Sequence, residues 1–332
     1  MNFSYRWAEM GDVPAIKEFL KIQFGPESIQ AAPERFESLF VRHPYGFHVA
    51  LCCDDVEIVA VRCYLPFYLS SPKRFCGFPI DLMVAPEHRR KGISSCLLAM
   101  ADERFELTVS SGQSSLQGEV YRKYGGHEVS EFHRALAVKK YRVKGPALKQ
   151  QVRDLISWAH WCLSCRKQGV ISKVAISELD HYAEFINNRL APHELGVAAD
   201  VDLVDWRYFN PFYRDCRLIS VKVGSASGLV AYRKIGEEVQ ILDLFASTDQ
   251  RCAILSGAVS ALSANYVTAL FAGGSLAKLF KEAGFIIRPH AAKLMVSGVG
   301  CATLNTINES EWLFFACASD IALLDFPAGG EL

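Results

Sequence analysis

The stretch that most restricts the fold of this chain is residues 79–100, PIDLMVAPEHRRKGISSCLLAM. The apolar run from Pro79 to Val84 predicts a short buried strand, which Pro86 ends. After Gly92, apolar residues recur at i, i+3, i+4 and i+7, so a helix with one buried face follows. A strand that enters a helix through a basic turn predicts an α/β architecture.

The turn between this strand and helix suits an anionic ligand. The first N–H groups of a helix have no intrahelical partner, and the helix macrodipole adds partial positive charge there. Gly92 lets the backbone come close to a bound group, and Arg89, Arg90 and Lys91 add three cationic side chains. This pattern favours a pyrophosphate or a 3′-phosphate over a neutral ligand, and a solvated basic surface turn is the alternative.

The segment 84–94, VAPEHRRKGIS, resembles the acyl-CoA signature of the GNAT acyltransferase superfamily, Arg/Gln-x-x-Gly-x-Gly/Ala. It departs from the signature at Ser94, where Gly or Ala is usual. The resemblance implies that a splayed or bulged central strand and the basic turn bind acyl-CoA. The implied binding residues are Leu82, Met83, Val84, Arg89, Arg90, Lys91, Gly92, Ile93 and Ser94.

A second motif agrees with the first in order and spacing. The segment 120–125, VYRKYG, is similar to the superfamily element Leu-Tyr-x-Lys-x-Gly-Phe, with Gly126 in the usual place of Phe. The resemblance implies that Tyr121 is the general acid that protonates the departing sulfur of coenzyme A. The alternative is a tyrosine that is simply packed, with its hydroxyl group hydrogen-bonded.

The general base is less clear from the sequence. Asp81 lies on the central strand and is a candidate, but a structural role is favoured because the second half of the chain carries a counterpart, Asp243. A water chain is another possibility. The remaining candidates, each more often structural or solvated, are Glu119, His127, His43 and His48.

The second half of the chain echoes the first. Residues 242–247, LDLFAS, echo 80–85, IDLMVA, and residues 279–284, LFKEAG, echo 120–125. The second copy has TDQRCA after its strand, without the basic triplet or the glycine, and Phe280 takes the place of Tyr121. We therefore expect it to have lost acyl-CoA binding of this kind.

The resemblance, together with the internal repeat, implies an α/β (α+β) protein with two tandem GNAT-like domains. Each has a mixed, mostly antiparallel central sheet flanked by helices. The expected parts are a catalytic, acyl-CoA-binding domain at 1–145, a linker helix at 146–168 and a degenerate domain at 169–332. The last is expected to be structural and to close one side of the acceptor pocket.

Charge and cysteine usage narrow the functional classes. The 36 Lys and Arg residues balance the 36 Asp and Glu residues, so no net field favours nucleic acid or an anionic membrane as a partner. Eleven scattered cysteines and an N-terminus without a signal-peptide pattern favour the reducing cytoplasm. Cys162 and Cys165 form a lone pair, so no metal is expected. The stretch 252–278 is long and apolar, but its polar residues divide it into a helix and a strand rather than a membrane span.

The resemblance implies an N-acyltransferase in which an amine acceptor attacks an acyl-CoA thioester directly in a ternary complex. Tandem GNAT proteins of this size include N-acyltransferases that act on nucleotide-linked amino sugars for surface polysaccharides, so this small-molecule acceptor is one expectation. The alternatives are a Fem-like transferase that uses aminoacyl-tRNA and a non-catalytic module that binds coenzyme A. The sequence does not indicate the acyl length or the oligomeric state.

Overall fold

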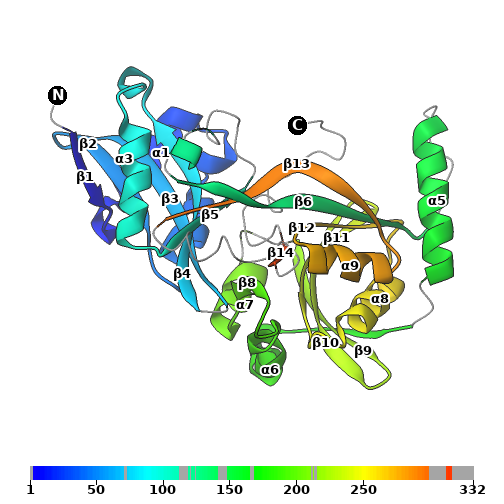
Figure 1. The fold of residues 1–332 in the computed structure, drawn as a ribbon. Helices are drawn as coiled ribbons and strands as arrows, with labels where there is room; N and C mark the ends of the chain where they lie inside the picture. Colours follow the sequence, from blue (N-terminus) through cyan, green and yellow to red (C-terminus); the bar gives the residue numbers. More distant parts are fainter. Residues whose placement is uncertain are drawn as a thin grey trace. The chain divides into compact units, whose positions relative to one another are not determined.

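The computed structural model describes residues 3–70, 73–111, 119, 121–123, 125–140, 148–164, 168–210, 212, 215–298 and 312–315. Contacts divide these residues into two compact units (Figure 1). Unit 1 contains the described residues up to Val129, together with Asn210, Phe212 and residues 294–298. Unit 2 contains the rest, so neither unit is one continuous segment of the chain.

Unit 1 is built on a mixed, mostly antiparallel sheet, which confirms the predicted fold class. Its first four strands form an antiparallel meander: β1 (Phe3–Trp7), β2 (Val49–Asp54), β3 (Glu57–Leu69) and β4 (Arg74–Val84). Strand β5 (Leu107–Ser111) is parallel to β4. The end of strand β13 (Ile286–Ser297) then pairs antiparallel with β5.

Helices pack against this sheet, and its strands are therefore buried on both faces. Successive residues of a strand point to opposite faces, and β2 is buried at its first five positions. Helix α3 (Ile93–Ala99) contacts β2, β3 and β4, while α1 (Val13–Phe24) contacts β3 (Figure 1). Pro14 occupies the first turn of α1, and the short helix α2 (Pro33–Phe36) follows.

A β-bulge interrupts β4 next to the predicted anion turn. The register shifts between the pair Val61–Met83 and the next pairs along β3, so Asp81 and Leu82 together oppose the single residue Arg62. Asp81 has a φ of 49°, a left-handed conformation that is rare for a residue other than glycine. The irregularity that the resemblance predicted near Leu82 is therefore present.

The strands β4 and β5 pair only near their beginnings within the part of the chain that the structure describes. Their parallel ladder consists of Cys76 with Leu107 and Gly77 with Thr108. Beyond these pairs β4 continues to Val84 without a strand on that side. On that side its main-chain groups have no partner strand among the described residues, and the Val84 carbonyl group accepts from the Arg89 side chain instead.

Unit 2 has the same strand order in a second set of strands. The meander is β7 (Val170–Lys173), β9 (Cys216–Val223), β10 (Ala226–Ile235) and β11 (Glu238–Phe245). Strand β12 (Tyr266–Ala272) is parallel to β11, and β6 (His127–Val138) is antiparallel to β12. The helices are α5 (Leu148–Ser164), α6 (Ala183–Asn187), α7 (Val201–Tyr208), α8 (Arg251–Ala261) and α9 (Gly274–Glu282).

The sheet of unit 2 also contains a bulge. The strand edge that is left open after the bulge in unit 1 is occupied by a further strand in unit 2. The register of β10 with β11 shifts between Ala231 and Tyr232, which places Asp243 at the bulge. Strand β14 (Trp312–Phe315) pairs with the end of β12, and β8 (Leu195–Ala198) pairs with β14. Because β6 already holds the other edge of β12, β14 lies on the edge that faces β11.

The last strand of each sheet comes from the opposite half of the sequence. Strand β6 follows β5 in the chain, yet it pairs with β12 in unit 2. Strand β13 follows α9, yet its end pairs with β5 in unit 1. The sequence boundary at residue 145 stays a prediction, because the units of the structure are defined by contacts and not by one cut.

The apolar stretch 252–278 folds as predicted, with most of α8 followed by β12. No helix in the described part of the chain combines the length and the apolar character needed to cross a bilayer. Strand β1 was not predicted, although its residues FSYRW alternate apolar and polar side chains, which is the signal of a half-buried strand.

Candidate functional site

The turn after β4 has the local geometry that the sequence predicted. A single helical turn, Pro86–His88, leads from the strand to Gly92, which is the N-terminal cap of α3. The N–H groups of Ser95 and Cys96 donate to the Gly92 carbonyl group over 3.0 and 3.2 Å and begin the helix. Arg89 Nε donates to the Val84 carbonyl group over 3.1 Å, which ties the turn to the end of the strand.

The surroundings of Gly92 leave room for a bound group. Its φ is 79°, a value that favours glycine, and a β-carbon at this position would meet no atom within 4 Å. Arg89, Arg90 and Lys91 are exposed, and Arg90 also has a positive φ. Of the other predicted binding residues, Val84 and Ile93 are buried, and Leu82, Met83 and Ser94 are half-buried.

Tyr121 lies within the same unit and contacts the helix that follows the turn. Its side chain is completely buried and packs with Leu98 of α3 and with Met295. Arg62 Nη2 donates a hydrogen bond of 2.6 Å to the phenolic oxygen. Burial raises the pKa of Tyr121 above its ordinary value, and the positive charge of Arg62 partly opposes this effect. Val120 of the motif lies outside the described residues.

Asp81 is half-buried at the bulge and forms an ion pair with Arg35 Nη1. Arg35 itself is only 1% exposed. A carboxylate whose charge is shared with a buried guanidinium group is a weak base, so this contact favours the structural role for Asp81. The equivalent contact in unit 2, between Asp243 and Arg189, favours the same interpretation.

Two of the four other base candidates are packed in unit 1. His43 Nδ1 accepts a hydrogen bond from the Tyr45 N–H group, and His48 Nε2 lies 3.1 Å from the Tyr45 carbonyl oxygen. Burial lowers the pKa of His48, so this ring is neutral near pH 7. Glu119 is exposed and His127 is half-buried. The identity of a general base stays open among these groups and water.

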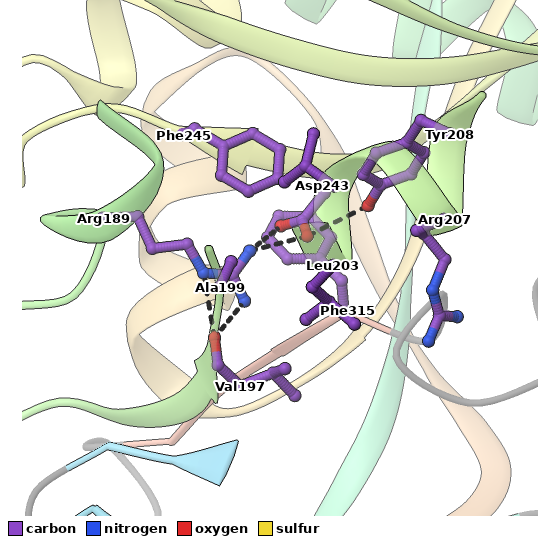
Figure 2. Close-up of a pocket in the computed structure, with 10 residues that line it drawn as sticks. Arg189, Val197, Ala199, Leu203, Arg207, Tyr208, Asp243, Phe245 and Phe315 are labelled. Carbon is purple, nitrogen blue, oxygen red and sulfur yellow. Dashed lines mark hydrogen bonds and ion pairs between the residues drawn. The ribbon is translucent and has the colours of Figure 1, made fainter. Parts of the chain in front are cut away.

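A pocket in unit 2 lies beside the bulge of β11 (Figure 2). About 350 Å³ of space free of protein atoms surrounds it, a volume that includes open solvent. Its apolar lining residues are Val197, Ala199, Leu203, Val204, Phe245 and Phe315, and its polar lining residues are Arg189, Arg207, Tyr208 and Asp243. Phe315 belongs to β14, the strand that fills the edge of β12.

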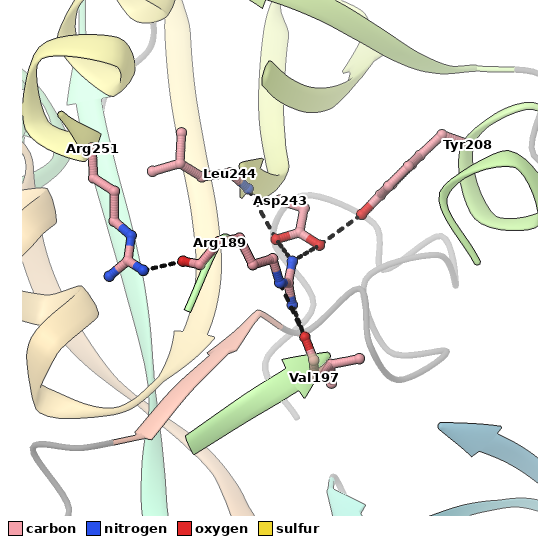
Figure 3. A network of polar contacts seen from close by, with 6 residues as sticks. All are labelled: Arg189, Val197, Tyr208, Asp243, Leu244 and Arg251. Carbon is pink, nitrogen blue, oxygen red and sulfur yellow. Dashed lines mark hydrogen bonds and ion pairs between the residues drawn. The ribbon is translucent and has the colours of Figure 1, made fainter. Parts of the chain in front are cut away.

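The polar groups beside this pocket bond mainly to one another (Figure 3). Arg189 Nη1 lies 2.6 Å from both carboxylate oxygens of Asp243, and the Tyr208 hydroxyl group donates to the same carboxylate over 3.1 Å. Arg189 also donates to the Val197 carbonyl group, and its own carbonyl group accepts from Arg251. The network therefore fixes the bulge and the loop before β8.

Glu194 completes the counter-charges of this network. Arg251 Nη2 lies 2.7 Å from Glu194 Oε2. Burial raises the pKa of Glu194, but the hydrogen bonds from Arg251 and from the Ala191 N–H group outweigh it and hold this pKa below its ordinary value. The carboxylate is therefore ionised at neutral pH.

Sequence reasoning missed the buried arginines that contact the bulge aspartates and Tyr121, which are Arg35, Arg189 and Arg62. Arg62 interrupts the apolar run VAVRCYLPF, and a single charge in a buried strand is a signal for a buried partner. The other two lie in polar surroundings and gave no such signal. Cys162 is exposed, and its predicted companion Cys165 lies outside the described residues.

Residues 13–108 match the family model described as the Acetyltransferase (GNAT) family. No curated protein matches the chain. Among solved structures, a probable N-acyltransferase from Enterococcus faecalis V583 matches with a TM-score of 0.64 at 17% identity, over 92% of this chain and 74% of that one. A GCN5-related N-acetyltransferase from Kribbella flavida has a TM-score of 0.64 at 12% identity over the same shares.

Eis1 from Mycobacterium abscessus matches with a TM-score of 0.56 at 13% identity, over 93% of this chain and 76% of that one. At these identities the similarity establishes the fold. The family match covers the first part of the chain, from α1 to the start of β5, and includes the turn at Gly92.

Proposed function

We propose that this chain, which contains a GNAT-family region at residues 13–108, is an acyltransferase that moves an acyl group from acyl-CoA to an amine. The observation that supports the proposal best is the turn between β4 and α3. It combines open space at Gly92, three exposed cationic side chains and a β4 edge that separates from β5. Open space and positive charge at a helix N-terminus favour a bound pyrophosphate.

In the proposed mechanism, the turn at Arg89–Ser94 holds the phosphate groups of the carrier, and the main chain of Leu82, Met83 and Val84 faces its pantetheine arm. The acceptor amine attacks the thioester carbon, and the carbon–sulfur bond breaks with its electron pair on sulfur. Tyr121 donates its proton to that sulfur. The proposed acceptor class is a small amine, with nucleotide-linked amino sugars as the first class to test.

The proposed binding turn is tested by Gly92→Glu. A side chain at this left-handed position adds bulk and negative charge where the pyrophosphate is expected, so acetyl-CoA affinity measured by calorimetry should be lost. Gly224→Glu is the matched control, because Gly224 also has a positive φ and open surroundings but lies in unit 2. Equal acetyl-CoA affinity in the two variants would contradict the site.

The acid is tested by Tyr121→Phe, which removes one hydroxyl group from a fully buried ring. Turnover should fall while the affinity for acetyl-CoA stays nearly unchanged, since the hydroxyl group acts only on the departing sulfur. Unchanged turnover would remove the role assigned to Tyr121.

A parallel titration with aminoacyl-tRNA distinguishes the acyl-CoA enzyme from a Fem-like transferase, which would bind the tRNA instead.

A further inference from the structure

Arg62 is a buried cation whose main polar contact is a tyrosine. Its side chain is 2% exposed, and its Nη2 lies 2.6 Å from the Tyr121 hydroxyl oxygen. The guanidinium carbon lies 5.7 Å from the centre of the Tyr64 ring and 5.6 Å from that of Tyr121. Within the described part of the chain, no carboxylate forms an ion pair with Arg62.

Burial of the Arg62 charge is unfavourable unless another group compensates the charge. Arginine stays protonated in proteins, and burying a cation without a counter-ion is unfavourable. Three other buried arginines, Arg35, Arg189 and Arg251, each face a carboxylate, whereas Arg62 faces a phenol. A phenol becomes a counter-ion when it loses its proton, so the pair is arranged to stabilise the phenolate form of Tyr121.

The other groups near Tyr121 do not compete for this role. Ser110 on β5 forms a hydrogen bond that also favours the phenolate. The Tyr64 hydroxyl group donates to the Leu97 carbonyl group over 3.0 Å, and its pKa is raised by burial, so it remains neutral. The negative charge of Asp102 raises the pKa of Tyr64 further. The residues of α3 and β13 that pack against Tyr121 are apolar, and they are Leu98 and Met295.

Unit 2 lacks both members of the pair at the corresponding positions. The residue that opposes the bulge aspartate Asp243 is Ala231, where unit 1 has Arg62. Phe280 takes the position of Tyr121 near the end of α9, because its carbonyl group accepts from the Phe285 N–H group as that of Tyr121 accepts from Gly126. The guanidinium group and the hydroxyl group are thus present in the unit with the basic turn, and both are replaced in the other.

We propose that Arg62 is a positioning residue that fixes the phenolic oxygen of Tyr121 and stabilises its phenolate after proton donation. This inference rests on the proposed acyl transfer. The acceptor nitrogen bonds to the thioester carbon, the carbon–sulfur bond breaks, and the phenol proton passes to sulfur. The phenolate, held by Arg62, regains a proton that the acceptor nitrogen releases through water, so protons and charge balance over one turnover.

The test compares Arg62→Met and Arg62→Lys in the full chain. Arg62→Met keeps the length of the side chain without its charge, and we expect kcat to fall about a hundredfold with little change in the KM for acetyl-CoA. Arg62→Lys keeps the charge and should restore part of kcat. Arg104→Met, which removes an exposed arginine stacked on Trp7 in the same unit, is the control and should leave kcat unchanged.

A spectroscopic readout separates positioning from mere packing. The ionisation of Tyr121 is followed by ultraviolet difference absorbance, with Tyr121→Phe subtracted to assign the signal. In Arg62→Met the ionisation should move to higher pH, and in Arg62→Lys it should stay close to that of the unmodified chain. An unchanged ionisation in folded Arg62→Met overturns the inference, whatever its activity.

The two levels of the proposal fail in different ways. Normal kcat in Arg62→Met, in a chain that transfers acyl groups, overturns the role of Arg62 and leaves the proposed function intact. A chain that binds no acetyl-CoA and transfers no acyl group overturns both. Loss of folding in both Arg62 variants, seen by circular dichroism, assigns Arg62 to packing alone and also overturns the inference.

Discussion

An arginine is paired with the aspartate at the bulge of each sheet. Asp81 meets Arg35 in unit 1, and Asp243 meets Arg189 in unit 2. A buried ion pair adds little net stability, but removing one partner leaves the other charge without compensation. We therefore attribute to these pairs the shape of the bulge rather than the overall stability of the protein.

Replacing one partner of the Asp243–Arg189 pair should lower the free energy of unfolding far more than replacing both partners. Asp243→Ala removes the carboxylate that faces the buried Arg189, so we expect the free energy of unfolding in urea to fall by about 3–5 kcal/mol. The double variant Asp243→Ala/Arg189→Met should recover most of that loss. The control Asp12→Ala breaks an ion pair with the partly exposed Arg6 and should cost less than about 1 kcal/mol. Equal losses in the single and double variants would contradict this account.

The same surface pair predicts a pH dependence. Hydrogen bonds from Arg6 lower the pKa of Asp12 to about 2, below its unfolded value. A carboxyl group with a lowered folded pKa stabilises the protein above its unfolded pKa and loses that contribution as pH falls through the folded value. The stability difference between the unmodified chain and Asp12→Asn should therefore be present at pH 6 and vanish near pH 2. Urea unfolding at several pH values measures it, and a pH-independent difference would refute it.

Among the elements, two helices end in the same way. The Gly126 N–H group donates to the Tyr121 carbonyl group over 2.9 Å, and that of Gly125 donates to Arg122 over 3.2 Å. In unit 2, Phe285 and Gly284 make the same two bonds to Phe280 and Lys281. This is the Schellman motif, in which the penultimate position needs a left-handed conformation.

The motif predicts equal costs in the two units. Gly125 and Gly284 have φ values of 76° and 88°, so Gly125→Ala and Gly284→Ala should each lower the free energy of unfolding by about 1–2 kcal/mol. Chemical denaturation measures both variants. Gly11→Ala is the control, because its β-carbon would meet no atom within 4 Å and its φ is not positive. A loss in the control as large as in the other two would show that alanine itself, not the cap, is responsible.

Elements with a strong local signal could be predicted from the sequence. The strand at 79–84 lies at the end of β4, the helix begins after Gly92, and the apolar stretch 252–278 contains a helix and a strand. Each depends on periodicity, proline or glycine, which act over a few neighbouring residues. The basic turn is one of these elements with a local signal, so the location of the proposed binding turn could be predicted.

Contacts between residues far apart in the sequence could not be predicted in this way. Arg62 reaches Tyr121, and Arg189 reaches Asp243, across more than fifty positions, and nothing in the local pattern of either residue names its partner. The strand β14 that fills the edge of β12 lies about forty positions further along the chain. Such contacts are set by packing and by the need to compensate buried charge, which only the folded chain specifies.

For the whole molecule, the exchange of last strands makes each unit dependent on distant sequence. Leu294–Ser297 of β13 covers the edge of β5, although nearly two hundred residues separate them. An uncovered strand edge exposes unpaired backbone groups and promotes aggregation. A cut at the end of the first half therefore removes a strand from unit 1, even though no residue of its own meander is lost.

This dependence can be tested with a graft. A fragment of residues 1–129 lacks the strand that pairs with Val109 and Ser110, so we expect no cooperative thermal unfolding and a tendency to aggregate. Joining residues 292–298 to the fragment through a flexible glycine–serine linker should supply that strand and restore a cooperative transition by circular dichroism. A graft of the same residues in scrambled order is the control. If the bare fragment already unfolds with the midpoint of the grafted one, β5 does not need β13, and the strand exchange has no role in the stability of unit 1.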